Sequence, residues 1–174
     1  LANRFLAEDE LSQPEPSNPL RVGFCHSCGH VQLIDTVSPT EMFTDYLYVS
    51  SASTTLKEHL FDLSDIVVER YRPGQDDLVI DIGCNDGTFL KAFRSLGMEV
   101  IGIDGAQQST DIAVAEGIPM VLGFFGLGSA DAVKKLLKPG SKIGLVLGMN
   151  VLAHTGKVNE FLAEATQLMG LDTV

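Results

Sequence analysis

The feature that most constrains this chain is a pattern of apolar run, glycine-containing turn and helix that repeats four times between residues 78 and 169. The apolar runs cover residues 78–82, 100–103, 120–122 and 143–147, and the helices after them are expected near residues 88–96, 107–116, 130–137 and 158–169. Strands joined by helices run parallel, and strands that are apolar on both faces are covered on both sides. The sequence therefore predicts an α/β fold, with a parallel sheet of about four strands over residues 75–174.

A smaller module is expected over residues 1–50. Prolines at positions 14, 16 and 19 favour extended backbone near its start. Cys25 and Cys28 follow as a Cys-x₂-Cys pair, next to a short apolar run at residues 31–34. Three cysteines in the whole chain are too few for a disulfide framework, whereas such a pair is typical of zinc sites. We predict a zinc-ribbon-like element with Cys25 and Cys28 as metal ligands; two buried thiols are the alternative.

A linker helix is predicted over residues 51–74, between the module and the repeat. Its apolar residues recur at steps of three and four, at positions 56, 60, 63, 67 and 71. Thr55 and Glu58 have the spacing of a capping box at its start, and Pro73 and Gly74 end it. We expect this helix to pack on the α/β domain.

The charge of the chain limits its partners. With 12 Lys and Arg against 23 Asp and Glu, the net charge is −11. Binding to a nucleic-acid backbone depends on Lys and Arg, so nucleic acid is not an expected partner. No apolar stretch reaches the about 20 residues of a membrane-spanning helix. We expect a cytoplasmic protein that acts on a small molecule and does not interact with membranes.

The turn after the first strand is the strongest functional signal. It runs from Asp81 through Gly83, Cys84, Asn85 and Asp86 to Gly87, and it opens a helix. Dinucleotide-binding turns have the pattern G-x-G-x-x-G, in which the second glycine lets a pyrophosphate reach backbone amides. Here that position is Asn85, and Asp86 would repel a pyrophosphate. Acidic and amide groups instead suit a ligand with ammonium and sulfonium charges, such as S-adenosylmethionine.

A second acidic group supports this interpretation. Asp104 and Gly105 end the second strand, where a carboxylate can bind both hydroxyls of a ribose. Taken singly, Asp86 could be a plain helix cap and Asp104 a solvent-facing strand end. Cys84 is expected to contact ligand through its backbone and not as a nucleophile, because no base motif accompanies it.

Several segments together resemble a known family, the S-adenosylmethionine-dependent sugar C-methyltransferases that act on nucleotide-activated 4-keto-deoxy sugars. The similar segments are residues 1–6, 25–33, 45–53 with His59 after them, 81–87, 123–125, and 150–154. The resemblance implies a Rossmann-like methyltransferase domain behind a zinc-binding domain, and a TDP-linked sugar as substrate. The implied reaction adds a methyl group to C3 of the sugar through an enolate.

The resemblance also implies roles for individual residues. His154 would donate a hydrogen bond to the enolate oxygen, and Tyr46 and Tyr48 would orient the sugar. Phe124 or Phe125 would stack on adenine while the other ring packs inward, and Asn150 would bind the amino-acid end of the cofactor. For His154 the alternative is a polar side chain at the next helix start. The alternative for Phe124 and Phe125 is that both rings pack in the core. Either tyrosine could instead be a half-buried aromatic residue of a β segment, and Asn150 could cap a turn.

The chain also departs from the family. The family's zinc has four cysteine ligands, and two of these, Cys25 and Cys28, are present here. The family's enzymes continue past position 174, so we expect a chain truncated at both ends, with its fourth strand around Leu145 exposed and the proton-abstracting base in the missing remainder. An O- or N-methyltransferase of the same fold, or a noncatalytic fragment that binds S-adenosylmethionine and zinc, are the alternative functions.

Overall fold

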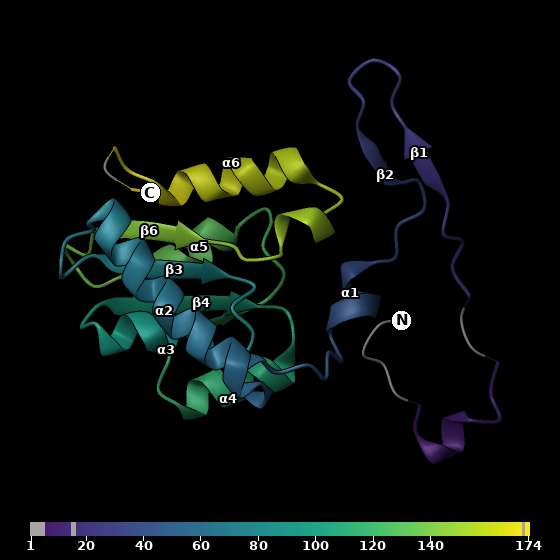
Figure 1. Ribbon diagram of the computed structural model, residues 1–174, viewed down its shortest axis with the longest axis horizontal. Helices are drawn as coiled ribbons and strands as arrows, with labels where there is room; N and C mark the ends of the chain where they lie inside the picture. The colour runs from purple at the N-terminus through teal and green to yellow at the C-terminus, as the bar shows by residue number, and fades with distance from the viewer. Residues whose placement is uncertain (1–5, 15–16, 172) are drawn as a thin grey trace.

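A single parallel sheet forms the centre of the computed structural model, which describes residues 6–14, 17–171 and 173–174 (Figure 1). Most of the 1–6 segment used for the family resemblance, and Pro16, therefore lie outside the described residues. The strands are β3 (Leu78–Ile82), β4 (Glu99–Asp104), β5 (Met120–Leu122) and β6 (Ile143–Leu147), in the order β5-β4-β3-β6. Every neighbouring pair is parallel. The predicted α/β fold is confirmed.

Helices cover both faces of this sheet. The helices α2 (Thr54–Tyr71), α3 (Thr88–Ser95) and α4 (Gln107–Ala115) contribute to one apolar cluster, together with Val79 and Val100 of the sheet. The helices α5 (Ser129–Lys134) and α6 (Val158–Leu168) contribute to the other, with Ile80 and Ile101. Because neighbouring residues of a strand point to opposite faces, β3 is buried along its whole length.

The start of α2 differs from the predicted capping box. Ser53 is the cap: its backbone is extended, with φ −107°, and its Oγ accepts a hydrogen bond from the backbone N–H of Leu56 at 3.2 Å. Thr55 therefore lies inside the first turn, and the predicted cap is wrong by two residues. Leu60 of the predicted apolar stripe is buried against the α/β core, as expected of a helix that packs on the domain.

The N-terminal module is an extended segment with a short hairpin. After the 3₁₀ turn η1 (Glu8–Glu10), the strands β1 (Val22–Phe24) and β2 (Val31–Leu33) pair in antiparallel fashion. Arg21 and Asp35 close the hairpin base with an ion pair of 2.6 Å between Nη2 and Oδ1. The hairpin projects from the α/β domain in Figure 1. The helix α1 (Pro39–Phe43) and the 3₁₀ turn η2 (Ser50–Ala52) lead the chain back to α2.

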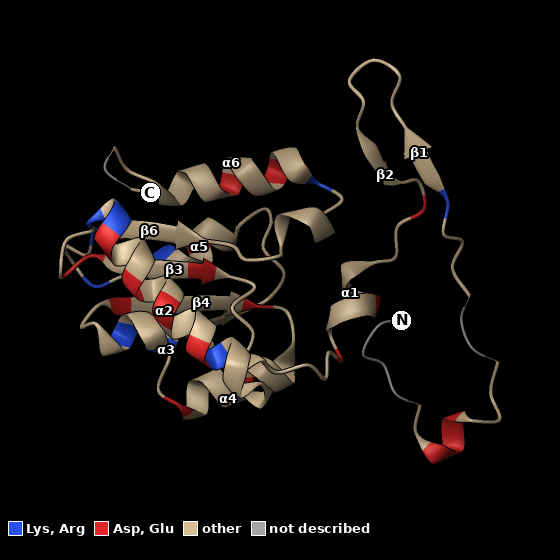
Figure 2. Cartoon of the chain, viewed as in Figure 1, with Lys and Arg blue, Asp and Glu red and all other residues tan. Residues whose placement is uncertain are grey.

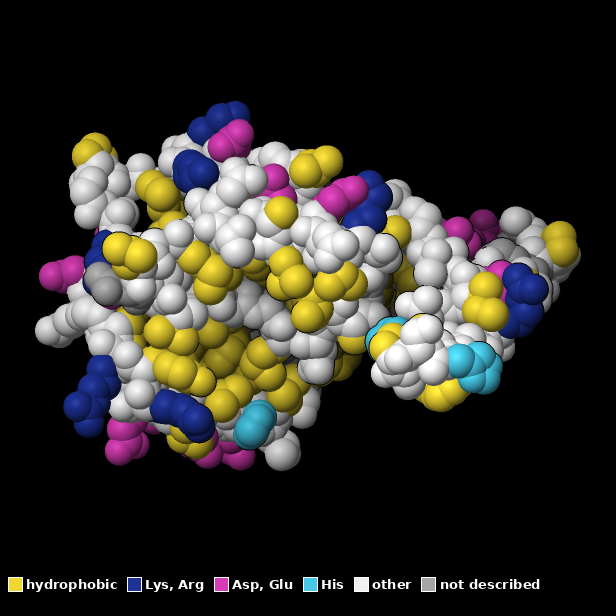
Figure 3. All heavy atoms as spheres, turned by 90° about the horizontal axis from the view of Figure 1, so that it is seen from above, with side chains coloured by type: hydrophobic (Ala, Val, Ile, Leu, Met, Phe, Trp, Pro, Cys, Tyr) yellow, Lys and Arg dark blue, Asp and Glu magenta, His cyan; other side chains and the backbone are white. Residues whose placement is uncertain are grey.

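The outer edge of β6 is partly paired. Val174 donates its N–H to the carbonyl of Gly144 at 3.0 Å, and its own carbonyl accepts from the N–H of Val146 at 2.8 Å. The edge predicted to be exposed around Leu145 is thus occupied there by the last residue of the sequence. The view from above looks onto this edge, where apolar side chains surround a hollow (Figure 3).

Candidate functional site

A cleft of about 370 Å³ lies at the carboxyl ends of the parallel strands. The loops after β3, β4, β5 and β6 form its floor and sides, and the segment that connects α1 to η2 closes it from the N-terminal module. This is the edge at which open α/β sheets bind ligands. The topology alone therefore places the cleft where the sequence predicted a ligand.

Most of the predicted site residues line this cleft. They are Tyr46, Tyr48, Asp81, Gly83, Cys84, Asn85, Asp104, Gly105, Phe124, Phe125, Asn150 and His154. Asp86 and Gly87 of the turn are outside the lining, and Cys25 and Cys28 lie in the loop between β1 and β2. The roles of these residues remain predictions, but segments up to 108 residues apart in sequence meet in one place.

The turn after β3 has a tightly constrained backbone. Gly83, Asn85 and Gly87 have positive φ angles of 71°, 55° and 72°. The N–H groups of Gly83 and Cys84 both donate to the carbonyl of Ile103, at 2.7 and 3.2 Å, which fixes the turn to the end of β4. A Cβ at Gly83 would lie 2.5 Å from Cγ2 of Val151, so a side chain at position 83 would force Val151 in the loop after β6 to shift.

Substitution of Gly83 by Ala should lower the free energy of unfolding by more than the about 1–2 kcal/mol that a left-handed alanine costs by itself. The additional loss comes from the clash with Val151. Gly97 is a matched control, because its φ is 89° and a Cβ there meets nothing within 4 Å. Urea unfolding of both variants measures the difference. Equal losses for Gly83→Ala and Gly97→Ala would contradict the close approach.

Asp104 joins the loop after β3 to the loop after β4, and these two loops form one corner of the cleft. Its Oδ2 accepts the N–H of Asn85 at 2.8 Å, and its Oδ1 accepts the N–H of Ala106 at 2.8 Å. Burial raises the pKa of Asp104 and outweighs these two hydrogen bonds, which lower it, while the nearby charge of Asp86 raises it further. Each carboxylate oxygen has a second lone pair, so Asp104 can also accept from ligand hydroxyls.

Asp81 is a buried acid without a full set of partners. It is 3% exposed, and no donor among the described residues reaches its Oδ1. Burial, assisted by the charge of Asp104, raises the pKa of Asp81 to about 7. Figure 2 shows acidic residues, in red, at the carboxyl ends of β3 and β4. A cationic group in the cleft would satisfy the free oxygen and reduce the repulsion, so this pair fits a positively charged ligand.

Cys84 is a packing residue within the turn. Its side chain is 5% exposed, and its Sγ lies 3.7 Å from Sδ of Met120. Burial, with the charges of Asp81 and Asp104, raises the pKa of the thiol well above its ordinary value. Because the thiolate is the reactive form, a raised pKa disfavours nucleophilic chemistry at this thiol, and the role of Cys84 stays a prediction.

The two phenylalanines after β5 point in different directions. Phe124 is 40% exposed and lies against Gly105, where a Cβ would come within 2.3 Å of its ring. Phe125 packs on Phe161 of α6, with ring centroids 4.9 Å apart. Phe124 is therefore the ring available to a flat ligand group beside Asp104, and Phe125 is the ring that packs inward.

An aromatic wall, defined here as Phe43, Tyr46, Tyr48 and His154, closes the other end of the cleft. The ring of Phe43 contacts Tyr46 and His154 edge-on, with centroids 5.6 and 5.9 Å apart, and Tyr46 lies 6.2 Å from Tyr48. His154 comes from the 3₁₀ turn η3 (Leu152–His154) after β6. Sequence reasoning missed Phe43, because one phenylalanine in a five-residue helix has no pattern around it. Asn150, with φ 55°, lies in the same loop and lines the cleft.

The loop between β1 and β2 carries Cys25 and Cys28. Cys25 N–H donates to the carbonyl of His30, and Gly29 N–H, at φ 72°, donates to the carbonyl of Cys25. Hydrogen bonds from the backbone of Cys28 and Ser27 lower the pKa of the Cys25 thiol. Donors aimed at a sulfur suit a thiolate ligand, so the pair fits half of a tetrahedral site. The described part of the chain contains no group of three or more candidate ligands.

Comparisons with known sequences cover both the N-terminal module and the α/β domain. Residues 1–43 match the Methyltransf_13 family, described as "Putative zinc binding domain". Over 172 residues, 99% of this chain, the sequence is 28% identical to the C-methyltransferase NovU of Streptomyces niveus. The chain is thus similar to a C-methyltransferase over nearly its whole length, and its first 43 residues match a family of zinc-binding domains.

Other relatives match about half of the chain. An O-methyltransferase of ubiquinone biosynthesis from Rhodopseudomonas palustris is 31% identical over 91 residues, which are 52% of this chain. The chain spans 40% of the length of NovU and 35% of the length of the O-methyltransferase. The crystal structure of coclaurine N-methyltransferase bound to N-methylheliamine and SAH has a similar fold, with a TM-score of 0.52 and 15% identity, over 79% of this chain and 40% of that one. No described helix is both long and apolar enough to cross a membrane.

Proposed function

We propose that this protein is a methyltransferase that transfers a methyl group from S-adenosylmethionine to C3 of a nucleotide-activated 4-keto-deoxy sugar, with a TDP-linked sugar as the acceptor. The observation that carries the proposal is the cleft at the carboxyl ends of the strands, which is lined both by the acidic corner around Asp81 and Asp104 and by the aromatic wall with its histidine. The corner suits a nucleoside with an adjacent positive charge, and the wall suits a polar ring.

The donor would bind along the turn after β3. Asp104 would accept hydrogen bonds from ribose hydroxyls, and Phe124 would offer a face for adenine. Asp81 would meet the ammonium group, and Asn150 the amino-acid end. Bound there, S-adenosylmethionine supplies an electrophilic methyl group on a positively charged sulfur, which accepts the electron pair of the broken S–C bond.

The acceptor would lie between this corner and the aromatic wall. Loss of the C3 proton to a base places negative charge on the C4 oxygen, and the electron pair at C3 then forms the new C–C bond. His154 would donate a hydrogen bond to that oxygen, and Tyr46 and Tyr48 would hold the sugar ring in line with the methyl group. Such fixed donors stabilise charge that develops in the transition state.

Two further parts of the proposal concern the binding of zinc and the biological role and location of the protein. Zinc would be held by the thiolates of Cys25 and Cys28 with two further ligands, because structural zinc sites are tetrahedral. We infer a structural role for the metal, since Cys25 and Cys28 are outside the cleft lining. We also propose a role in deoxysugar biosynthesis, which follows from the proposed acceptor, and a location in the cytoplasm.

Methyl transfer from isotope-labelled S-adenosylmethionine tests this function. TDP-linked 4-keto-deoxy sugars should become labelled on carbon, while phenol and amine acceptors stay unlabelled, and His154→Ala should lower kcat by about 100-fold, within the range of a lost oxyanion donor. Label on oxygen or nitrogen would replace this proposal by an O- or N-methyltransferase. Binding of S-adenosylhomocysteine without turnover of any acceptor would support a noncatalytic fragment.

A further inference from the structure

The side chains of Asn85 and Asp86 reach out of the turn to the backbone of residues 48–51. Asn85 Oδ1 accepts the N–H of Ser50 at 2.8 Å, and its Nδ2 donates to the carbonyl of Tyr48 at 2.9 Å. Asp86 Oδ2 accepts the N–H of Ser51 at 2.9 Å. Three hydrogen bonds therefore join the turn after β3 to the segment that carries the tyrosines of the aromatic wall.

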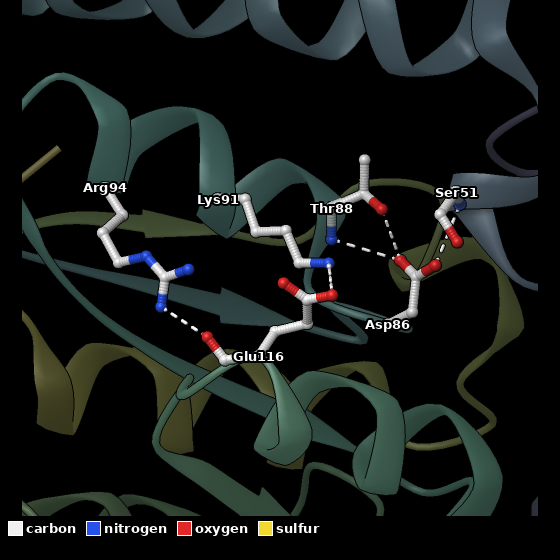
Figure 4. Close-up of polar contacts among 6 residues, drawn as sticks. All are labelled: Ser51, Asp86, Thr88, Lys91, Arg94 and Glu116. Carbon is white, nitrogen blue, oxygen red and sulfur yellow. Dashed lines mark hydrogen bonds and ion pairs between the residues drawn. The ribbon is translucent and has the colours of Figure 1, made fainter.

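Asp86 is rigidly held while it makes this contact. It is 0% exposed, and its Oδ1 accepts both the N–H and the Oγ1 hydroxyl of Thr88, at 3.1 and 2.6 Å (Figure 4). Burial alone would raise the pKa of Asp86, but the hydrogen bonds from Ser51 and Thr88 outweigh it, and the pKa is lowered. The carboxylate is thus a charged acceptor fixed to the start of α3.

The backbone of Asn85 is held by Asp104, while its side chain forms hydrogen bonds with the segment that contains Tyr48 and Ser50. Its backbone N–H donates to Asp104 Oδ2 at 2.8 Å, and its φ of 55° is one that Asn adopts more readily than most residues. The same residue thus contacts the acid of the cofactor corner through its backbone and the acceptor-side segment through its side chain. Asp104 and Ser50 are therefore joined through Asn85 by two hydrogen bonds.

The contacted segment, residues 46–51, is also held near both of its ends. Its C-terminal end is fixed where η2 runs into α2, and its N-terminal end touches the domain through the ring of Phe43 on His154. Between these points, Tyr48 and Ser50 line the cleft, and Tyr48 is 40% exposed. Their backbone is positioned by Asn85 and Asp86.

We propose that Asn85 and Asp86 are positioning residues that couple occupation of the cofactor corner to the placement of the acceptor-side segment, residues 46–51. The inference rests on the proposed function, because it takes the corner as the donor site and the aromatic wall as the acceptor site. Coupling between two sites is reciprocal, so acceptor bound at the wall strengthens donor binding by the same factor.

Amide hydrogen exchange with S-adenosylhomocysteine as the probe tests the coupling without an acceptor. In the native protein, saturation with the probe should slow exchange of the Ser50 and Ser51 amides at least tenfold. Glycine tolerates the positive φ at this position, and in Asn85→Gly saturation with the probe should slow exchange of the Ser50 amide less than twofold. Arg72→Gly is the matched control, because Arg72 also has positive φ, 50°, at the far end of α2.

Steady-state kinetics provides a second measurement. Asn85→Gly should raise KM for the sugar acceptor at least tenfold and KM for S-adenosylmethionine by a smaller factor, while Arg72→Gly changes neither. Probe binding that leaves the exchange of Ser50 and Ser51 unchanged in the native protein would overturn the coupling and leave the proposed function intact. Failure of the native protein to bind the probe would overturn both.

Discussion

Replacing Asp104 with Asn should weaken binding of S-adenosylhomocysteine at least about 100-fold. Hydrogen bonds to a charged group are worth about 1.5–3 kcal/mol each, and two ribose hydroxyls would lose such a partner. Every 1.4 kcal/mol corresponds to about a tenfold change in affinity, so two bonds account for the expected loss. Isothermal titration of the native protein and the variant measures it.

The same substitution also disturbs the protein itself, because Asp104 accepts the N–H groups of Asn85 and Ala106. A second ligand separates the two effects. The native protein should bind the 2′-deoxy analogue of S-adenosylhomocysteine at least tenfold more weakly than the parent compound, whereas Asp104→Asn should bind both about equally. If the variant still discriminates between the two ligands, Asp104 is not the ribose partner.

The affinity for S-adenosylhomocysteine should rise with pH between 5 and 7 and level off above. The pKa of Asp81 is raised to about 7, so the free protein holds a proton there at lower pH, and a ligand ammonium prefers the ionised form. Proton release on binding near pH 6 should appear as a calorimetric enthalpy that depends on the buffer. Asp81→Asn should remove the pH dependence and weaken binding at pH 8.

Stability should show the opposite trend. An acid whose pKa is raised on folding binds more protons in the native state, so the free energy of unfolding falls as pH rises from about 4 to about 7 and is constant above. The full change is on the order of 4 kcal/mol, because each pKa unit corresponds to about 1.4 kcal/mol. Asp81→Asn should flatten this profile and stabilise the free protein at pH 8. A native profile without this slope would contradict the buried, unpartnered acid.

The sheet and its ligand edge could be predicted because they depend on local patterns. Apolar runs such as 78–82 are buried on both faces, and parallel strands bring the residues that follow them to one edge. Asp81 and Asp104, at the ends of adjacent strands, had to meet once that topology was known. Phe124 and Phe125 follow the same logic at the end of β5.

Contacts between distant segments could not be predicted in this way. The bonds from Asn85 to the backbone of Tyr48 and Ser50 use carbonyl and amide groups that every residue has, so no sequence pattern marks them. The cap of α2 was misplaced because Ser53, Thr54 and Thr55 can all cap a helix, and only the backbone geometry selects Ser53. The strand β1 was not predicted because its three residues are too few for a periodic pattern to be recognised.

A crystal structure of the protein grown with S-adenosylhomocysteine tests the central claim most directly. We expect density for the nucleoside along the turn from Gly83 to Gly87, with the ribose on Asp104, the adenine on Phe124, and the sulfur directed toward Tyr48 and His154. Density for the compound outside this cleft, or a cleft that stays empty at saturating ligand, would contradict the assignment of this corner to the methyl donor.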